Sequence, residues 1–161
     1  MLLVAAMALA LSLAAGVALA QTFGDQGGQG VTKTCPTNCS GTQYPDTLKG
    51  TNNDNTIKGL GTQESPNWGD LIQGHGGEDT LDGDQGGDKV EGGNGADTVN
   101  GDAGNDAVIG GTGNDHINTG PGSDSITAGD GYKDVINCDN GYDTLVSYDR
   151  GLDVFVDCER R

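Results

Sequence analysis

The sequence has few of the residues from which a large core or a catalytic centre is usually built. Aromatic residues make up 4% of its 161 residues, which excludes a large core of packed rings. Lys and Arg number 8 against 24 Asp and Glu, and the formal net charge of −16 excludes the basic surface that nucleic-acid binding requires. The two histidines, His75 and His116, belong to no Glu-x-x-His or His-Glu-x-x-His zinc motif. We therefore expect no enzymatic activity.

Glutamate is also scarce, since Asp accounts for 20 of the acidic residues and Glu for only 4. A solvated acidic surface uses both residues freely. An excess of the shorter Asp indicates carboxylates at defined turn positions, where they bond to the backbone or bind hard cations. Composition alone would also fit a disordered acidic chain, so the sequence pattern has to decide between the two.

Long apolar runs are confined to residues 1–20, MLLVAAMALALSLAAGVALA. This segment has no charged side chain and ends in Ala18-Leu19-Ala20, the small-x-small sequence that signal peptidase accepts. It lacks the basic residue near Met1 that such signals usually carry, and an uncleaved membrane anchor is the alternative. We expect a secretory signal peptide, an extracellular protein, and no membrane insertion after cleavage.

A nine-residue repeat dominates the remaining sequence. Residues 92–118 read GGNGADTVN, GDAGNDAVI and GGTGNDHIN, and the same phase holds best over residues 74–146. The eighth position is apolar in every unit, and the sixth is Asp in every unit except the one with Asn55. A period of nine fits no helical face, and a flexible linker would keep the composition without keeping these columns. The repeat therefore predicts an ordered all-β structure.

Each half of the repeat has its own structural role. Positions seven to nine, such as Thr98-Val99-Asn100, alternate polar, apolar and polar, which predicts a three-residue strand with one side chain inside. Positions one to six are rich in glycine and predict a turn. Two units then form one coil of eighteen residues, and the coils stack about 4.8 Å apart as parallel strands in two sheets. The predicted fold is a parallel β-roll, a form of β-helix or solenoid.

Residues eighteen apart become vertical neighbours in such a stack. Asp79, Asp97 and Asp115 fall in one row, and Asp88, Asp106 and Asp124 fall in a row on the opposite edge. Carboxylates stacked about 5 Å apart repel one another in a partly desolvated turn. A cation between each vertical pair would reverse this repulsion, and loop carbonyl groups would complete the all-oxygen shell that Ca²⁺ prefers.

These units resemble the glycine-rich nonapeptide of RTX, or haemolysin-type, calcium-binding repeat proteins. The resemblance implies a β-roll over residues 41–157, with Ca²⁺ held between turns by the sixth-position carboxylates of Asp79, Asp88, Asp97, Asp106, Asp115, Asp124, Asp134 and Asp143. It also implies main-chain oxygen ligands from the first four positions, among them Gly74, Gly83, Gly92, Gly101 and Gly110. Lys133 is an insertion before Asp134 that weakens the match there, and the substitution Asn55 suits a cap better than a metal site.

Four cysteines lie beyond the expected signal peptide, at Cys35, Cys39, Cys138 and Cys158. An even number in an exported chain predicts two disulfides, out of three possible pairings. We expect Cys35–Cys39 and Cys138–Cys158, because each pair brackets one end of the repeats and could close a cap; a CxxxC zinc site is the alternative. Residues 21–40 are expected to form a flexible leader, and residues 158–161 a C-terminal tail.

Two classes of function are compatible with this pattern. The first is a secreted calcium-binding β-roll with a structural or surface-associated role, which folds on extracellular Ca²⁺ and has a cell-surface or matrix partner. The second is a ligand-, surface- or ice-binding solenoid with purely structural calcium sites, which presents Thr112 and Asn114 outward. Such a face needs a regular row, whereas the third position reads Gly76, Gln85, Asn94, Ala103, Thr112 and Pro121.

Overall fold

A computed structural model describes residues 29–61 and 69–158, so the expected signal peptide lies outside the described residues. Within these ranges the chain forms β-strands and no helix, and hence no helix that could cross a membrane. The strands are β1 (Thr32–Thr34), β2 (Asn38–Ser40), β3 (Thr47–Lys49), β4 (Thr56–Lys58), β5 (Leu71–Gly76), β6 (Thr80–Asp82), β7 (Lys89–Asn94), β8 (Thr98–Asn100), β9 (Ala107–Thr112), β10 (His116–Asn118), β11 (Ser125–Thr127), β12 (Val135–Asn137), β13 (Thr144–Ser147) and β14 (Val154–Val156).

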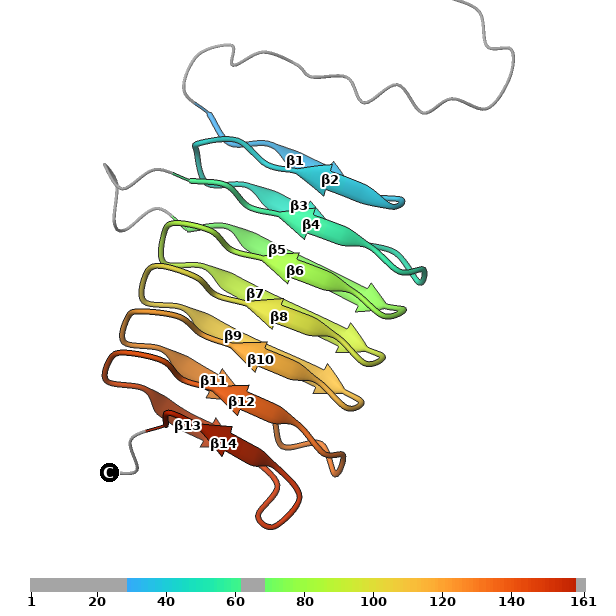
Figure 1. The fold of residues 1–161 in the computed structure, drawn as a ribbon. Helices are drawn as coiled ribbons and strands as arrows, with labels where there is room; N and C mark the ends of the chain where they lie inside the picture. Colours follow the sequence, from blue (N-terminus) through green and yellow to red (C-terminus); the bar gives the residue numbers. More distant parts are fainter. Residues whose placement is uncertain (1–28, 62–68, 159–161) are drawn as a thin grey trace, which may run out of the picture.

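The strands stack as two parallel sheets, which confirms the predicted β-roll (Figure 1). The odd-numbered strands form one seven-stranded sheet and the even-numbered strands form the other. Val99 pairs with Leu81, eighteen residues earlier, as the repeat predicts. The offset grows to 24 residues between Leu48 and Ile72, where the chain carries an insertion, and to 19 between Ile117 and Ile136. The extra residues therefore lie in the turns, and the apolar eighth-position residues remain paired across neighbouring strands.

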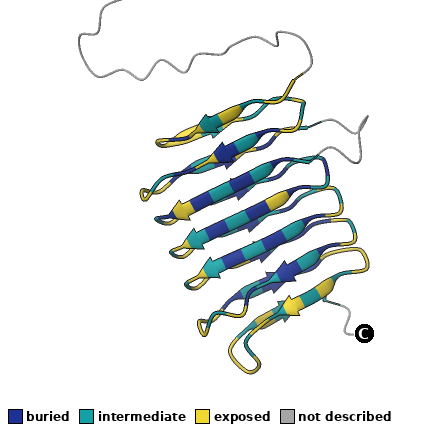
Figure 2. Ribbon diagram, turned by 180° about the vertical axis from the view of Figure 1, so that it is seen from behind, coloured by how far each residue is buried: buried dark blue, intermediate teal, exposed yellow. Residues whose placement is uncertain are grey.

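The core is a single column of aliphatic side chains along each sheet. The eighth-position residues from β3 to β12 are fully buried: Leu48, Ile57, Ile72, Leu81, Val90, Val99, Val108, Ile117, Ile126 and Ile136. Their equivalents in the last coil, Leu145 and Phe155, are only partly buried. Figure 2 shows the same trend, since buried residues recur along the middle strands whereas the last coil is intermediate or exposed. The interior is thus narrow and regular.

Four strands are longer than the three residues expected, and β13 exceeds that length by only one residue. Strands β5, β7 and β9 have six residues each, because the pairing continues through the glycines that follow the apolar position. His75 pairs with Gly93, whose φ of 120° lies in the left-handed region. A Cβ on Gly93 would lie 2.3 Å from the carbonyl oxygen of His75, so this close approach requires glycine.

The stack begins one coil earlier than the sequence indicated. Residues 32–34 and 38–40, expected to belong to a flexible leader, form β1 and β2 and pair with β3 and β4. This coil was not predicted because it has neither the glycine positions nor the sixth-position Asp. Lys33 stands in the core column opposite Leu48, and its Nζ donates to the carbonyl oxygen of Ser40 at 2.6 Å. A lysine in this position covers the end of the core with its aliphatic stem.

Both expected disulfides are present. Cys35 bonds to Cys39 in the first coil. Cys138, which follows β12, bonds to Cys158, which lies beyond β14, so this bond spans the last coil. Tyr148 and Phe155 add an edge-to-face ring contact at the C-terminal end, with centroids 5.3 Å apart. The two ends of the stack are therefore closed by covalent bonds, and at the C-terminal end also by an aromatic contact.

Candidate metal centre

The sixth-position aspartates lie in two vertical rows, one before each sheet. The main-chain N–H of Asp79 donates to Oδ1 of Asp97 at 2.8 Å, and that of Asp97 donates to Oδ1 of Asp115 at 2.9 Å. On the other edge, Asp88 and Asp106 donate in the same way to the residues eighteen positions on, both at 2.8 Å. The expected vertical pairs are therefore direct neighbours, joined by charge-assisted hydrogen bonds.

Each row also contains residues that were not among the expected calcium ligands. The first runs through Asp46, Asp70, Asp88, Asp106, Asp124 and Asp143, and the second through Asn55, Asp79, Asp97, Asp115, Asp134 and Asp153. Asp134 keeps its place despite the inserted Lys133, since Asp115 donates to its Oδ1 at 2.8 Å. Asp70 was not among the expected ligands, although it precedes the strand of Ile72, because the insertion before it breaks the nine-residue phase.

The second carboxylate oxygen has a different environment from the first. Among the described residues, the Oδ2 atoms of eight row members are buried and have no hydrogen-bond partner: Asp70, Asp79, Asp88, Asp97, Asp106, Asp115, Asp124 and Asp134. These residues are at most 5% exposed. A buried acceptor without a partner typically destabilises a fold by about 1–3 kcal/mol, and more when charged. Eight such atoms in register point to a ligand that is not a protein group.

Main-chain oxygens lie beside the same atoms. A Cβ on Gly74 would lie 2.4 Å from Oδ2 of Asp79 and 2.3 Å from the carbonyl oxygen of Gly92. Gly83, Gly92 and Gly101 show the same pair of contacts, each with the Asp five residues on and a carbonyl one coil on. Carbonyl oxygens in these turn positions include those of all five glycines that the sequence predicted as ligands: Gly74, Gly83, Gly92, Gly101 and Gly110. Carboxylate and carbonyl oxygens therefore converge in the turns of Gly74, Gly83, Gly92 and Gly101.

Burial changes the acidity of these carboxyls. It is the largest cause of a raised pKa at six positions, to about 7 at Asp70, Asp106 and Asp134 and to about 6 at Asp88, Asp97 and Asp124. The pKa values of Asp79 and Asp115 are raised by burial as well. The N–H donor of the vertical neighbour opposes the rise, whereas the charge of a neighbouring carboxylate adds to it at Asp106. A cation at these oxygens would favour the ionised form.

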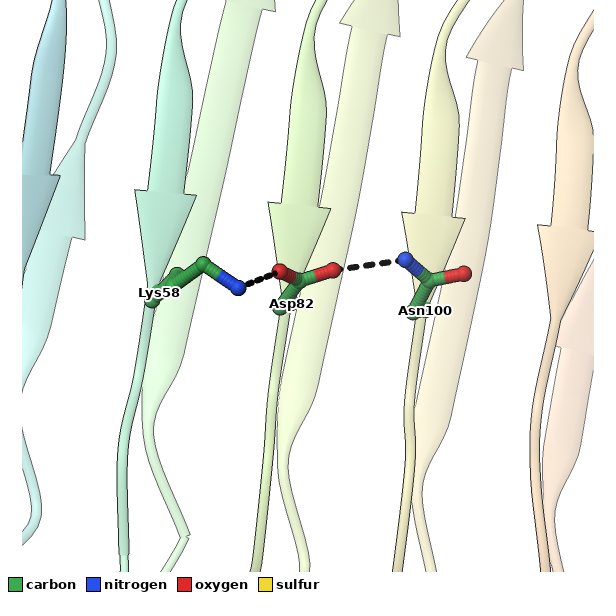
Figure 3. A network of polar contacts seen from close by, with 3 residues as sticks. All are labelled: Lys58, Asp82 and Asn100. Atoms are coloured by element: carbon green, nitrogen blue, oxygen red, sulfur yellow. Dashed lines mark hydrogen bonds and ion pairs between the residues drawn. The ribbon is translucent and has the colours of Figure 1, made fainter.

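Asp82 and Asp46 have protein donors on both carboxylate oxygens instead. Asp82 lies on the outer face of β6, between Lys58 of β4 and Asn100 of β8 (Figure 3). Its Oδ2 meets Lys58 Nζ at 2.5 Å, and its Oδ1 accepts from Asn100 Nδ2 at 2.6 Å. At the N-terminal end of its row, just before β3, Asp46 also has donors on both oxygens, from the N–H groups of Val31 and Thr42.

The donor set of the rows is made of oxygen alone. In the described ranges, no three side chains of His, Cys, Asp or Glu form a cluster that could hold a metal ion. A cation held by these residues would therefore need main-chain carbonyl oxygens in addition to the carboxylates. Such a set of hard oxygen ligands, with flexible geometry and no nitrogen or sulfur, suits Ca²⁺.

Comparison with known families agrees with this donor set. A family model for the RTX calcium-binding nonapeptide repeat (4 copies) matches residues 40–61, 69–90, 82–117, 100–132 and 109–145. No curated protein and no solved structure gives a significant match. The matched segments span more than half of the chain and contain the turns in which carboxylate and carbonyl oxygens converge. This chain belongs to the RTX calcium-binding nonapeptide repeat family.

Proposed function

We propose that this chain is a secreted calcium-binding β-roll with a structural or surface-associated role, which folds when it meets extracellular Ca²⁺. The observation that carries the proposal is the register of buried, unpartnered Oδ2 atoms along both edges, of which those of Asp70, Asp79, Asp88, Asp97 and Asp106 lie beside main-chain carbonyl oxygens. A cation supplies the positive charge that these oxygens need. The family to which the repeats belong supports calcium as that cation.

The residues that would hold the ions are those of the central coils. On one edge they are the carboxylates of Asp70, Asp88 and Asp106, and on the other those of Asp79, Asp97 and Asp115. Carbonyl oxygens of the first-position glycines would complete each shell. The protein groups hold the carboxylates in place through the N–H to Oδ1 bonds, which leaves Oδ2 for the ion.

Export is supported by two independent features. Residues 1–20 have the composition and the small-x-small ending of a signal peptide. All four cysteines are paired in disulfides, which persist in oxidising, extracellular environments. A calcium-dependent fold would keep such a chain extended until it reaches a calcium-rich medium.

A calorimetric Ca²⁺ titration of residues 21–161 tests the proposal. We expect several ions to bind, with dissociation constants of about 10⁻⁴ to 10⁻³ M, the range of extracellular modules. Mg²⁺ serves as the control, since it demands a small octahedral shell and dehydrates reluctantly. A chain that binds no Ca²⁺, or that saturates at one ion, would refute the proposal.

The alternative of a ligand- or ice-binding plane has a weaker basis. The Thr112 hydroxyl donates to Asn94 Oδ1 at 2.8 Å, so these two outward groups already satisfy each other. The row on this edge reads Gly76, Asn94 and Thr112 at paired positions, without a repeated side chain. A regular ligand lattice would need a repeated row.

A further inference from the structure

The second residue of a turn, directly after the first position of the repeat, adopts one of two backbone conformations. The turns that begin at Gly41 and Gly50 carry Thr42 and Thr51 there, and neither threonine has a positive φ. The left-handed region is unfavourable for a β-branched side chain, whereas Asp and His enter it more readily. Eight other turns have a positive φ at this position, between 53° and 120°: those of Leu60, His75, Asp84, Gly93, Asp102, Gly111, Gly120 and Asp139.

The two threonine turns are closed by their own main-chain donors. The N–H of Thr42 donates to Oδ2 of Asp46 at 2.5 Å, and the N–H of Thr51 donates to Oδ1 of Asn55 at 2.7 Å. Asp46 and Asn55 are each 3% exposed, so these acceptors are satisfied by the protein and not by water. We call these two turns closed.

The other turns leave the equivalent oxygen without a donor. Seven of the eight buried, unpartnered Oδ2 atoms among the described residues belong to turns with a positive φ at the second position: those of Asp70, Asp79, Asp88, Asp97, Asp106, Asp115 and Asp124. The eighth belongs to Asp134, whose second-position residue, Gly129, has no positive φ but donates its N–H to Ser147 Oγ at 3.3 Å. No second-position N–H therefore reaches the sixth-position oxygen in these eight turns, which we call open.

The fourth position does not follow the same division. Gly104 and Gly122 occupy it in two open turns, and neither has a positive φ. Oδ2 of Asp106 and of Asp124 nevertheless lacks a partner in those turns. The second position is therefore the one whose main-chain donor distinguishes closed turns from open ones.

The ligand oxygens themselves are placed alike in both kinds of turn. A Cβ on Gly41, in a closed turn, would lie 2.2 Å from Oδ2 of Asp46 and 2.4 Å from the carbonyl oxygen of Gly59. A Cβ on Gly74, in an open turn, would lie 2.4 Å and 2.3 Å from the corresponding oxygens. The closed turn thus has the same pair of oxygens and differs by one N–H donor.

We propose that the backbone at the second position selects which turns bind calcium, and that Thr42 and Thr51 exclude the ion from their turns by donating their own N–H groups. This inference rests on the proposed function and deepens it, since calcium binding requires open turns but does not require any turn to be closed. An N–H group carries a positive partial charge, so it both occupies the acceptor oxygen and repels a cation. The turns on either side of β3 are then held by hydrogen bonds alone.

Asp102→Thr tests the inference in an open turn, with Asp102→Asn as the matched control. Both variants remove the same charge, but Asn tolerates the left-handed φ of 65° at this position, whereas Thr does not. We expect Asp102→Thr to turn its N–H to Oδ2 of Asp106 and to bind one ion fewer than wild type, and Asp102→Asn to bind the same number as wild type. Native mass spectrometry at saturating Ca²⁺ counts the ions, and far-UV circular dichroism in Ca²⁺ checks that each variant retains the β-roll.

Thr42→Gly tests the inference in a closed turn and does not depend on the first pair. Glycine can adopt a positive φ, so we expect the N–H to leave Asp46 and the variant to bind one more ion than wild type. Thr42→Val, which keeps the β-branch and lacks the hydroxyl, should bind the wild-type number. Tyr44→Gly, which places glycine at the fourth position of the same turn, should also leave the count unchanged.

The ion counts separate this inference from the proposed function. If wild type binds several Ca²⁺ ions and Thr42→Gly gains none, the selection by the second position is refuted while the proposed function stands. Equal losses in Asp102→Thr and Asp102→Asn would refute it as well, because charge and not backbone conformation would then decide binding. If wild type binds no Ca²⁺, the proposed function fails and this inference fails with it.

Discussion

The two oxygens of a sixth-position aspartate have different partners at the residue scale. In Asp106, Oδ1 accepts the N–H of Asp88 at 2.8 Å, while Oδ2 is buried without a hydrogen-bond partner among the described residues. The first contact orients the carboxylate, and the second oxygen is left for a ligand. Each internal carboxylate takes part in two vertical pairs, one with the coil before it and one with the coil after it.

Asp106→Ala should therefore remove more than one calcium ion. The side chain belongs to the pairs Asp88–Asp106 and Asp106–Asp124, so its loss affects two neighbouring positions. Asp54→Ala is the matched control, because Asp54 is exposed, lies outside the rows and accepts the N–H of Glu78 at 2.9 Å. Ion counts by native mass spectrometry distinguish the two. Equal losses in both variants would show that the carboxylates act only through total charge.

Acidification should stabilise the calcium-free chain. Burial raises the pKa of Asp70 and Asp106 in the fold to about 7, from an ordinary value of 3.8, so the fold retains protons that the unfolded chain releases. The resulting penalty is absent below about pH 4 and complete above about pH 7, and stability falls as pH rises through this window. Far-UV circular dichroism in chelator at pH 5 and pH 7.5 measures the effect, as a larger β-sheet signal at the lower pH. A larger β-sheet signal at pH 7.5 than at pH 5 would contradict the assignment of these carboxyls as buried.

Protons and calcium should also compete, since both bind the ionised carboxylates. We expect the Ca²⁺ affinity to fall between pH 7.5 and pH 5 over the same window in which the calcium-free chain gains stability. These opposite trends distinguish a specific ion site from a general loss of stability in acid.

At the scale of the strand, each nine-residue unit contributes one buried side chain. Leu81 is fully buried between Ile57 and Val99 of the neighbouring strands. The column continues without a gap from Leu48 to Ile126 on one sheet and from Ile57 to Ile136 on the other. A cavity at one level therefore weakens the contacts of the coils above and below it.

Leu81→Ala should destabilise the calcium-bound fold by about 2–5 kcal/mol, the usual range for a buried leucine. Leu152→Ala serves as the control, because Leu152 is 48% exposed in the last turn. The free energy of unfolding, from urea titrations in Ca²⁺, compares the two variants. A similar small effect in both would mean that the aliphatic column contributes little beside the ions.

The repeat made most of these elements predictable, because position in the nine-residue unit determines both strand and burial. The eighth-position column and the vertical Asp pairs, such as Asp79 with Asp97, follow from the period alone. The coil of β1 and β2 does not, since it keeps the register without the repeat residues. The different partners of Oδ1 and Oδ2, and the N–H bonds of Thr42 and Thr51, depend on atomic positions that a sequence pattern does not specify.

At the scale of the whole molecule, the ends of the stack differ from its middle. The Cys138–Cys158 disulfide joins residues 20 apart and encloses the last coil, whose core positions Leu145 and Phe155 are only partly buried. In the chain-entropy model, a loop of this length stabilises the fold by about 3 kcal/mol. The paired variant Cys138→Ser with Cys158→Ser should therefore unfold at lower urea in Ca²⁺. Free thiols at Cys138 and Cys158 in protein isolated from the medium would contradict the bond.

The charge of the whole roll makes the ions central to its folding. Residues 70–157 carry 19 acidic and 3 basic side chains, and many of the acidic groups are stacked in two rows. The apolar area buried by one aliphatic residue per unit is small beside the chain entropy lost on ordering nine residues. Calcium binding would then supply free energy of folding, as structural metals do in other small domains.

Far-UV circular dichroism of residues 21–161, recorded first in chelator and then in millimolar Ca²⁺, tests this central claim most directly. We predict a largely unfolded chain in chelator that gains β-sheet signal on addition of Ca²⁺, and that loses it again when chelator is restored. A chain that is fully folded in chelator, with a spectrum unaffected by Ca²⁺, would contradict the account.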